Sequence, residues 1–123
     1  MTEIADNDVI SLQQTVCAQN NSDYVEANSD DKLGFASRTV NLLPLNGLRH
    51  LVTDSTTGWY LWFGEELSQE PDFFEPMHVS HVYEKYPETR ALLGLAPGFR
   101  FLVAGTHVDI WFDEQLLNTK ESQ

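Results

Sequence analysis

The stretch Gly58-Trp59-Tyr60-Leu61-Trp62-Phe63-Gly64-Glu65-Glu66 determines how the rest of this sequence is interpreted. It sets five consecutive aromatic or aliphatic residues, 59–63, between two glycines and ends on two carboxylates. Aromatic side chains are enriched in β-strands because they fit a pleated surface, and glycines commonly bound such runs. Neighbouring side chains of a strand point to opposite faces, and here both faces are apolar. The stretch 59–63 is therefore predicted to be an interior strand.

Short apolar segments on both sides of this stretch predict an antiparallel sheet. The predicted strands cover residues 33–40, 48–52, 59–63, 99–103 and 107–112. Pro44 and the Asn46-Gly47 pair are typical of a turn between the first two strands, and 104–106 supplies a hairpin reversal between the last two. Because short connections favour antiparallel neighbours, we expect an antiparallel sheet of about five strands.

Between predicted strands three and four the apolar spacing becomes helical. Val79, Val82, Tyr83 and Tyr86 form one apolar stripe of a helix over 78–86. Pro87 suits the first turn of a second short helix, 88–93. The expected fold class is α+β, with this helical pair inserted between strands three and four and covering one face of the sheet.

Composition divides the chain into three parts. Residues 1–32 are polar and acidic, and they are predicted to be a partly mobile N-terminal segment with a short helix. Residues 33–117 are predicted to form a single α+β domain, in which 73–76 is an apolar patch between two prolines. Residues 118–123 are interpreted as a polar tail.

The overall composition bounds the compartment. The 123 residues are 41% hydrophobic, which suits one globular domain. No apolar run approaches the ~20 residues that a membrane helix needs, and the N-terminus lacks a signal-peptide pattern. The single cysteine, Cys17, has no internal disulfide partner. These features favour a cytoplasmic protein.

The net charge of −12 bounds the class of partner, with nineteen acidic residues against seven basic ones. Phosphates and anionic lipid surfaces would be repelled, so neither nucleic acid nor a membrane is expected as a partner. A basic protein would be attracted and its capture accelerated. Solubility alone is the other explanation of such a charge.

Two groups of ionisable residues are candidates for a reactive site. His78, His81 and Glu84 have a spacing that a metal site could use on a helix, yet no cysteine or H-E-x-x-H pattern accompanies them. Glu65 and Glu66 are adjacent in a strand and so point to opposite faces. We therefore expect no catalytic residue, no metal site and no cofactor.

An alternative remains in which the chain is a small ligand-binding domain or a hydrolase that uses Glu65, Glu66 and Asp109, because Asp109 could supply a second carboxylate. Cys17 lacks a neighbouring base and carries no nucleophile signature. An accessory module in a larger assembly is the third possibility.

Tryptophan is both a core anchor and a frequent contact residue at protein interfaces. Trp59 suits the core, whereas Trp111 shares one face of its predicted strand with His107 and Asp109. This mixed aromatic and acidic face is the predicted recognition surface. The candidate partner-binding residues are Glu65, Glu66, Trp62, His107, Asp109, Trp111 and Asp113.

Several of these segments together resemble the immunity protein 33 domain family. The resemblance rests on Ala36-Ser37-Arg38-Thr39-Val40, on the stretch from Asp54 through Glu66, and on Phe73-Phe74, Leu92–Phe101 and Ile110–Asp113. It covers about residues 34–117. It implies a bacterial immunity protein that neutralises a toxin by binding it and that has no active site of its own. The sequence leaves the oligomeric state and the identity of the toxin open.

Overall fold

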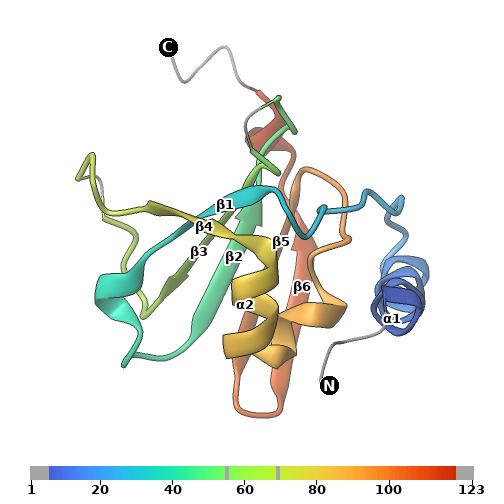
Figure 1. Ribbon diagram of the computed structural model, residues 1–123, viewed down its shortest axis with the longest axis horizontal. Helices are drawn as coiled ribbons and strands as arrows, with labels where there is room; N and C mark the ends of the chain where they lie inside the picture. The colour runs from blue at the N-terminus through green and yellow to red at the C-terminus, as the bar shows by residue number, and fades with distance from the viewer. Residues whose placement is uncertain (1–5, 55, 69, 119–123) are drawn as a thin grey trace.

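The computed structural model describes residues 6–54, 56–68 and 70–118. The helices and strands in chain order are α1 (Asp6–Gln19), β1 (Lys32–Phe35), the 3-10 helix η1 (Ser37–Thr39), β2 (Leu45–Arg49), β3 (Trp59–Phe63), β4 (Glu75–His78), α2 (Val79–Lys85), the 3-10 helix η2 (Pro87–Ala91), β5 (Phe99–Ala104), β6 (His107–Phe112) and the 3-10 helix η3 (Glu114–Leu117). Figure 1 shows α2 in front of the sheet and α1 beside it.

The sheet has six strands in the order β4-β1-β3-β2-β5-β6 and is mixed. β1 and β3 run parallel, with Gly34 opposite Tyr60, and the other neighbouring pairs are antiparallel. The α+β class is confirmed, but the prediction of an antiparallel sheet of about five strands is wrong, because the sheet is mixed and has a sixth strand. The chain leaves β1, crosses to β2 and returns to place β3 between them. The short connection from β1 to β2 therefore does not join neighbouring strands, whereas the one from β2 to β3 does.

The sixth strand is β4, which overlaps the predicted apolar patch, 73–76, and the start of the predicted helix, 78–86. Pro76 lies within β4, and a proline is compatible with a strand at the edge of a sheet because one side of the strand needs no partner. The helical pair α2 and η2 consequently follows the fourth strand of the structure. It still lies between the predicted third and fourth strands, β3 and β5.

The other boundary errors lie before β3. Asn46 and Gly47, predicted to form a turn, lie inside β2, and the Asn46 side-chain amide donates to the Gly64 carbonyl at 2.7 Å. Gly47 is needed there because a Cβ atom would run into the ring of Phe101 on β5. The first strand was predicted to cover residues 33–40, but β1 ends at Phe35 and η1 begins at Ser37.

β3 is an interior strand, as its sequence predicts. Trp59 and Leu61 lie in the main core, between the sheet and the helices. Trp62 faces the other way into a second, smaller core with Phe73 and Leu116. Each face of β3 is therefore covered by a different part of the chain.

The N-terminal segment is tied to the sheet by the fully buried Arg49. Its guanidinium donates to the carbonyls of Val25 at 2.7 Å, Leu95 at 2.8 Å and Thr57 at 2.9 Å. Burial lowers the pKa of Arg49 to about 10. These bonds fix the strand-like segment after α1 against the loop that leads into β5.

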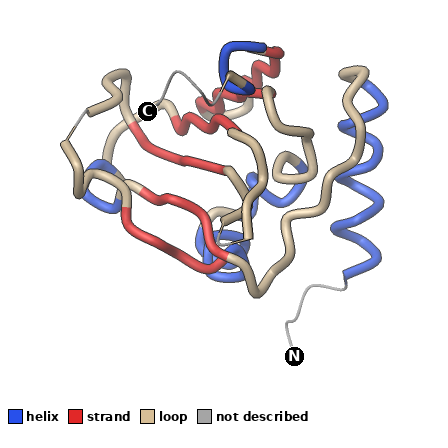
Figure 2. The backbone as a smooth tube through the Cα atoms, turned by 90° about the horizontal axis from the view of Figure 1, so that it is seen from above, coloured by secondary structure: helices blue, strands red, loops and turns tan. Residues whose placement is uncertain are grey.

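Further contacts hold α1 in the same place. The amide of Gln13 donates to the Tyr83 hydroxyl at 2.8 Å and to the Arg90 carbonyl at 2.9 Å. Viewed from above, α1 is a separate rod alongside the sheet (Figure 2). Residues 1–5 and 119–123, which belong to the predicted mobile segment and to the predicted tail, lie outside the described residues.

Candidate functional site at the free edge of the sheet

The candidate contact residues at the end of β3 are divided between core and surface. Trp62 is buried, and its ring meets that of Phe74 at a centroid distance of 6.3 Å. Its indole Nε1 has no hydrogen-bond partner among the described residues. Glu65 and Glu66 are exposed beyond the strand end. A partner could reach these carboxylates directly, whereas Trp62 lies beneath Phe73 and Phe74.

The glutamates do not share a site with Asp109. Two strands, β2 and β5, separate β3 from β6, which places the strands roughly 14 Å apart at about 4.8 Å per strand. Asp109 instead contacts His107, with 3.0 Å between Oδ2 and Nε2. The structure therefore does not assemble the carboxylate group that the hydrolase alternative requires.

The remaining candidates lie together on and just after β6. On the strand face that also carries Arg100 of β5, Asp113 accepts a hydrogen bond from the guanidinium at 3.2 Å. The same guanidinium lies 5.6 Å from the centroid of the Trp111 ring. His107, Asp109 and Trp111 share one face of β6, where Arg100 forms an ion pair with Asp113 and lies against the Trp111 ring.

The opposite face of β6 carries three apolar side chains, those of Val108, Ile110 and Phe112. Val108 is 48% exposed and Phe112 is 50% exposed, while Ile110 is half-buried. Val16 of α1 and Leu92 lie across the hollow from this face without covering it. Alternation showed that these residues share a face, but only the positions of the helices show that the face is uncovered.

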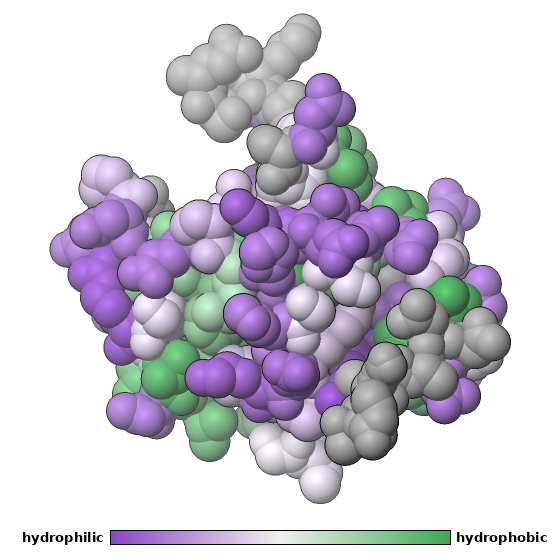
Figure 3. Space-filling view, in the orientation of Figure 1, coloured by the Kyte–Doolittle hydropathy of each residue, from purple (hydrophilic) through white to green (hydrophobic). Residues whose placement is uncertain are grey.

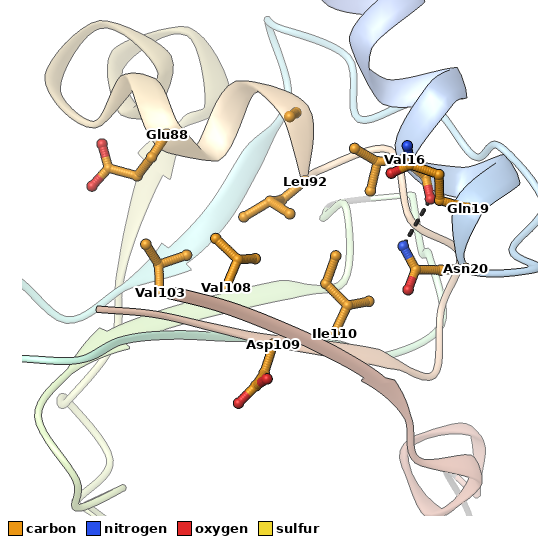
Figure 4. A pocket seen from close by; sticks show the side chains of 10 residues that line it. Val16, Gln19, Asn20, Glu88, Leu92, Val103, Val108, Asp109 and Ile110 are labelled. Atoms are coloured by element: carbon orange, nitrogen blue, oxygen red, sulfur yellow. Dashed lines mark hydrogen bonds between the residues drawn. The ribbon is translucent and has the colours of Figure 1, made fainter. Parts of the chain in front are cut away.

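An open hollow of about 600 Å³ lies over these side chains. Figure 4 shows Val103, Val108 and Ile110 pointing up into it from the sheet, opposite Leu92 and Val16. A second hollow of about 520 Å³ continues along β6. The residues that line the second hollow are Asn20, Asn21, Ser22, Asp23, Ala96, Pro97, Phe99, Ile110, Trp111 and Phe112. Because both hollows include Asn20 and Ile110, we describe them together as the β6 groove.

The far wall of the β6 groove is the segment that follows α1. The Asn20 side chain donates to the Val16 carbonyl at 2.9 Å, and the Ser22 hydroxyl accepts from the Ala96 N–H at 3.0 Å. Cys17 is buried behind this wall and donates to the Gly94 carbonyl at 3.3 Å. Burial raises the pKa of the Cys17 thiol, which makes it a poor nucleophile at neutral pH.

Among the described residues β6 pairs only with β5, so it is also a free edge of the sheet that they form. The Asp113 N–H donates to the Gly98 carbonyl at 2.7 Å, which fixes the alternation of the antiparallel ladder. In that alternation His107, Asp109 and Trp111 bond inward to β5. The N–H and C=O groups of Val108, Ile110 and Phe112 therefore point outward, and no described residue outside the strand bonds to them.

The charged residues that line the β6 groove are all acidic. Its two linings include the acidic residues Glu88 and Asp23 and contain no lysine or arginine. Asp109 also borders the first hollow, but its carboxylate points to the other face of β6 (Figure 4). The surface seen in Figure 3 is largely hydrophilic, with separate hydrophobic areas toward its margins. A chain with a net charge of −12 thus places an apolar groove within an acidic surface.

Other kinds of site have little support in the part of the chain that the structure describes. No three histidine, cysteine or acidic side chains there are grouped so that they could hold a metal ion. The ring of His78, the last residue of β4, lies 6.1 Å from the ring of His81 on α2. Within the same ranges, no helix combines the length and apolar composition that crossing a membrane requires.

Comparison with protein families matches residues 12–113 to the Imm33-like domain. The chain belongs to the Imm33-like domain family. The family resemblance seen in the sequence is thereby confirmed, and the matched range of this Imm33-like domain includes both walls of the β6 groove. Searches of the curated proteins and of the solved structures found no match.

Proposed function

We propose that this Imm33-like domain is a bacterial immunity protein that binds a protein toxin at the β6 edge and neutralises it without catalysis. Membership in an immunity-protein family supports a protein toxin as the partner and a non-enzymatic role. The observation that carries the location is the β6 groove, where exposed apolar side chains and an unpaired strand edge meet. An exposed apolar area of this kind on a single domain is typical of a protein contact surface.

The charge supports a basic toxin as the partner. Carboxylates line the groove without a compensating lysine or arginine, and the whole chain is strongly acidic. Complementary charge accelerates encounter and discriminates against acidic proteins. The complex is therefore expected to form faster at low salt than at high salt, because salt screens this attraction. The neutralisation would take place in the cytoplasm.

His107, Asp109, Trp111 and Asp113 belong to the proposed contact surface. Glu65 and Glu66 remain candidates for a second contact, beside the exposed side chains of Leu42 and Leu67. Leu42 packs against Gly64, so this acidic and apolar area lies directly after β3.

Coexpression with the protein encoded beside its gene tests the proposal. That protein is expected to arrest growth when produced alone, and coexpression of this chain is expected to restore growth. The two proteins should also elute together in size-exclusion chromatography at low salt. A neighbouring protein that is harmless alone, or a toxic one that neither associates with the chain nor is neutralised by it, would contradict the proposal.

Substitution of Trp111 locates the contact. Trp111 is 40% exposed and lies over Arg100, so Trp111→Ala is expected to weaken toxin binding by at least about tenfold while leaving thermal unfolding little changed. Leu43→Ala is the control, because Leu43 is an exposed apolar residue in the loop before β2. Loss of binding in Leu43→Ala but not in Trp111→Ala would move the contact away from β6.

A further inference from the structure

The two edges of the sheet differ in what they offer to another strand. β4 is four residues long and contains Pro76, which has no N–H to donate. β6 is six residues long, contains no proline and presents the outward N–H and C=O groups of Val108, Ile110 and Phe112. An unpaired edge of this kind is a template for a further strand. Only β6 can therefore accept a regular ladder of hydrogen bonds.

The two faces of β6 select different side chains on such a strand. Side chains that stand beside Val108, Ile110 and Phe112 would enter the apolar groove. Side chains at alternate positions would stand on the other face, beside Asp109 and Trp111. A cation there would meet the Asp109 carboxylate, which attracts it, whereas the Trp111 ring is already in contact with Arg100.

We propose that the partner contributes an extended segment of alternating apolar and basic residues, which pairs with β6 as a seventh strand of the sheet. The inference rests on the toxin-binding function proposed above and specifies which part of the toxin is recognised. Backbone hydrogen bonds supply the pairing, and the groove and Asp109 supply the selectivity. A second copy of this chain is disfavoured as the occupant because each copy carries a net charge of −12.

The test uses the full-length chain and a synthetic probe. The probe is a fluorescent octapeptide of alternating valine and lysine, blocked at both ends, and the matched control replaces each lysine by glutamate. Binding is followed by fluorescence anisotropy at low salt. The lysine peptide is expected to bind at least about tenfold more tightly than the glutamate peptide.

A pair of variants at one position separates backbone pairing from side-chain contact. Val108→Pro removes an outward N–H and leaves the bonds to β5 in place, whereas Val108→Ala keeps that N–H and trims the side chain. Val108→Pro is expected to weaken binding of the lysine peptide by about tenfold relative to Val108→Ala, the effect of one lost hydrogen bond with its acceptor left unpaired. Equal binding by the two variants would overturn the inference.

Amide hydrogen exchange of the unmodified chain gives a second measurement that does not depend on the folding of Val108→Pro. The lysine peptide is expected to slow exchange at Val108, Ile110 and Phe112 by at least about tenfold, and to change His107 and Asp109 less because their amides already bond to β5. Unchanged exchange at the three outward amides would overturn the inference. So would failure of the peptide to bind, or dimers that Val108→Pro abolishes.

Failure of this inference is distinguishable from failure of the proposed function. Growth rescue by Val108→Pro as efficient as by Val108→Ala would leave the immunity function in place and remove the added strand. Selective peptide binding at β6 by a chain that neutralises no toxin would support the strand site and reject the immunity function.

Discussion

Replacement of Arg49 by methionine tests whether one buried cation holds the N-terminal wall of the β6 groove. Arg49 is fully buried, stacks over Trp59 at 5.5 Å and reaches carbonyls on three separate segments. Methionine is similar in length and apolar, so Arg49→Met removes the donors without leaving a large cavity. The carbonyls of Val25, Leu95 and Thr57 would then be buried with one donor fewer.

The structure sets the size of the expected loss. Each of the three bonds shorter than 3.0 Å joins a charged donor to a carbonyl, and such bonds are worth about 1.5–3 kcal/mol. The opposing cost is desolvation, because the fall of the Arg49 pKa from 12.5 to about 10 corresponds to about 3 kcal/mol. We therefore expect Arg49→Met to lower the free energy of unfolding by about 3 kcal/mol, a large part of the ~5–15 kcal/mol typical of a domain.

Equilibrium unfolding in urea at neutral pH, followed by tryptophan fluorescence, measures this loss. Arg38→Met is the matched control, since Arg38 bridges Glu70 and Asp72 on the surface at 3.3 and 3.2 Å. Exposed ion pairs of this kind are worth about 0–1 kcal/mol. If Arg49→Met lowers the free energy of unfolding by less than about 1 kcal/mol, or Arg38→Met lowers it equally, the buried Arg49 bonds do not stabilise the fold as expected.

Three further predictions follow from buried or strained positions. Gly58→Ala should lower the free energy of unfolding by about 2–4 kcal/mol, because Gly58 has φ +90° and a Cβ atom there would collide with a backbone carbonyl. Gly105→Ala is the control and should lower it by only about 1–2 kcal/mol, because Gly105 has φ +64° but lies in open space. Equal losses in urea unfolding would contradict this comparison. Burial raises the pKa of Tyr83 from 10.0 to about 12, so between these pH values the folded chain keeps a proton that the unfolded chain loses. Between pH 10 and pH 12 the free energy of unfolding should therefore fall by about 2 kcal/mol more in the unmodified chain than in Tyr83→Phe. Parallel pH profiles of the two chains would contradict this prediction. The Cys17 thiol should react with a disulfide reagent far more slowly in the folded chain than in urea, because it is buried and its pKa is raised; rapid reaction of the native chain would show that α1 separates from the sheet.

The sequence predicts well wherever local pattern and tertiary packing favour the same structure. Alternation and bounding glycines place β3 at residues 59–63, and helical spacing places α2 within the predicted range 78–86. The β5–β6 hairpin also lies where alternation predicts it. In each case the apolar residues that make the pattern are the residues that the fold buries or pairs.

Prediction fails where a local signal is outweighed by a neighbouring strand. Asn46-Gly47 is typical of a turn, but Gly47 is required inside β2 because the Phe101 ring occupies the space of a side chain. Pro76 argues against a strand, but β4 tolerates it because β4 is at an edge. The parallel β1–β3 pair depends on a crossover that no spacing in the sequence encodes.

The candidate site divides along the same line. The acidic charge, the family and the alternation of polar and apolar residues over 107–112 can be read from the sequence, because they depend only on composition and order. The fold, by contrast, was needed to show that Trp62 is covered, that two strands lie between β6 and the strand before Glu65, and that β6 is a free edge facing a groove. Burial and strand order arise from contacts between residues far apart in the chain, and such contacts leave no local signal in the sequence.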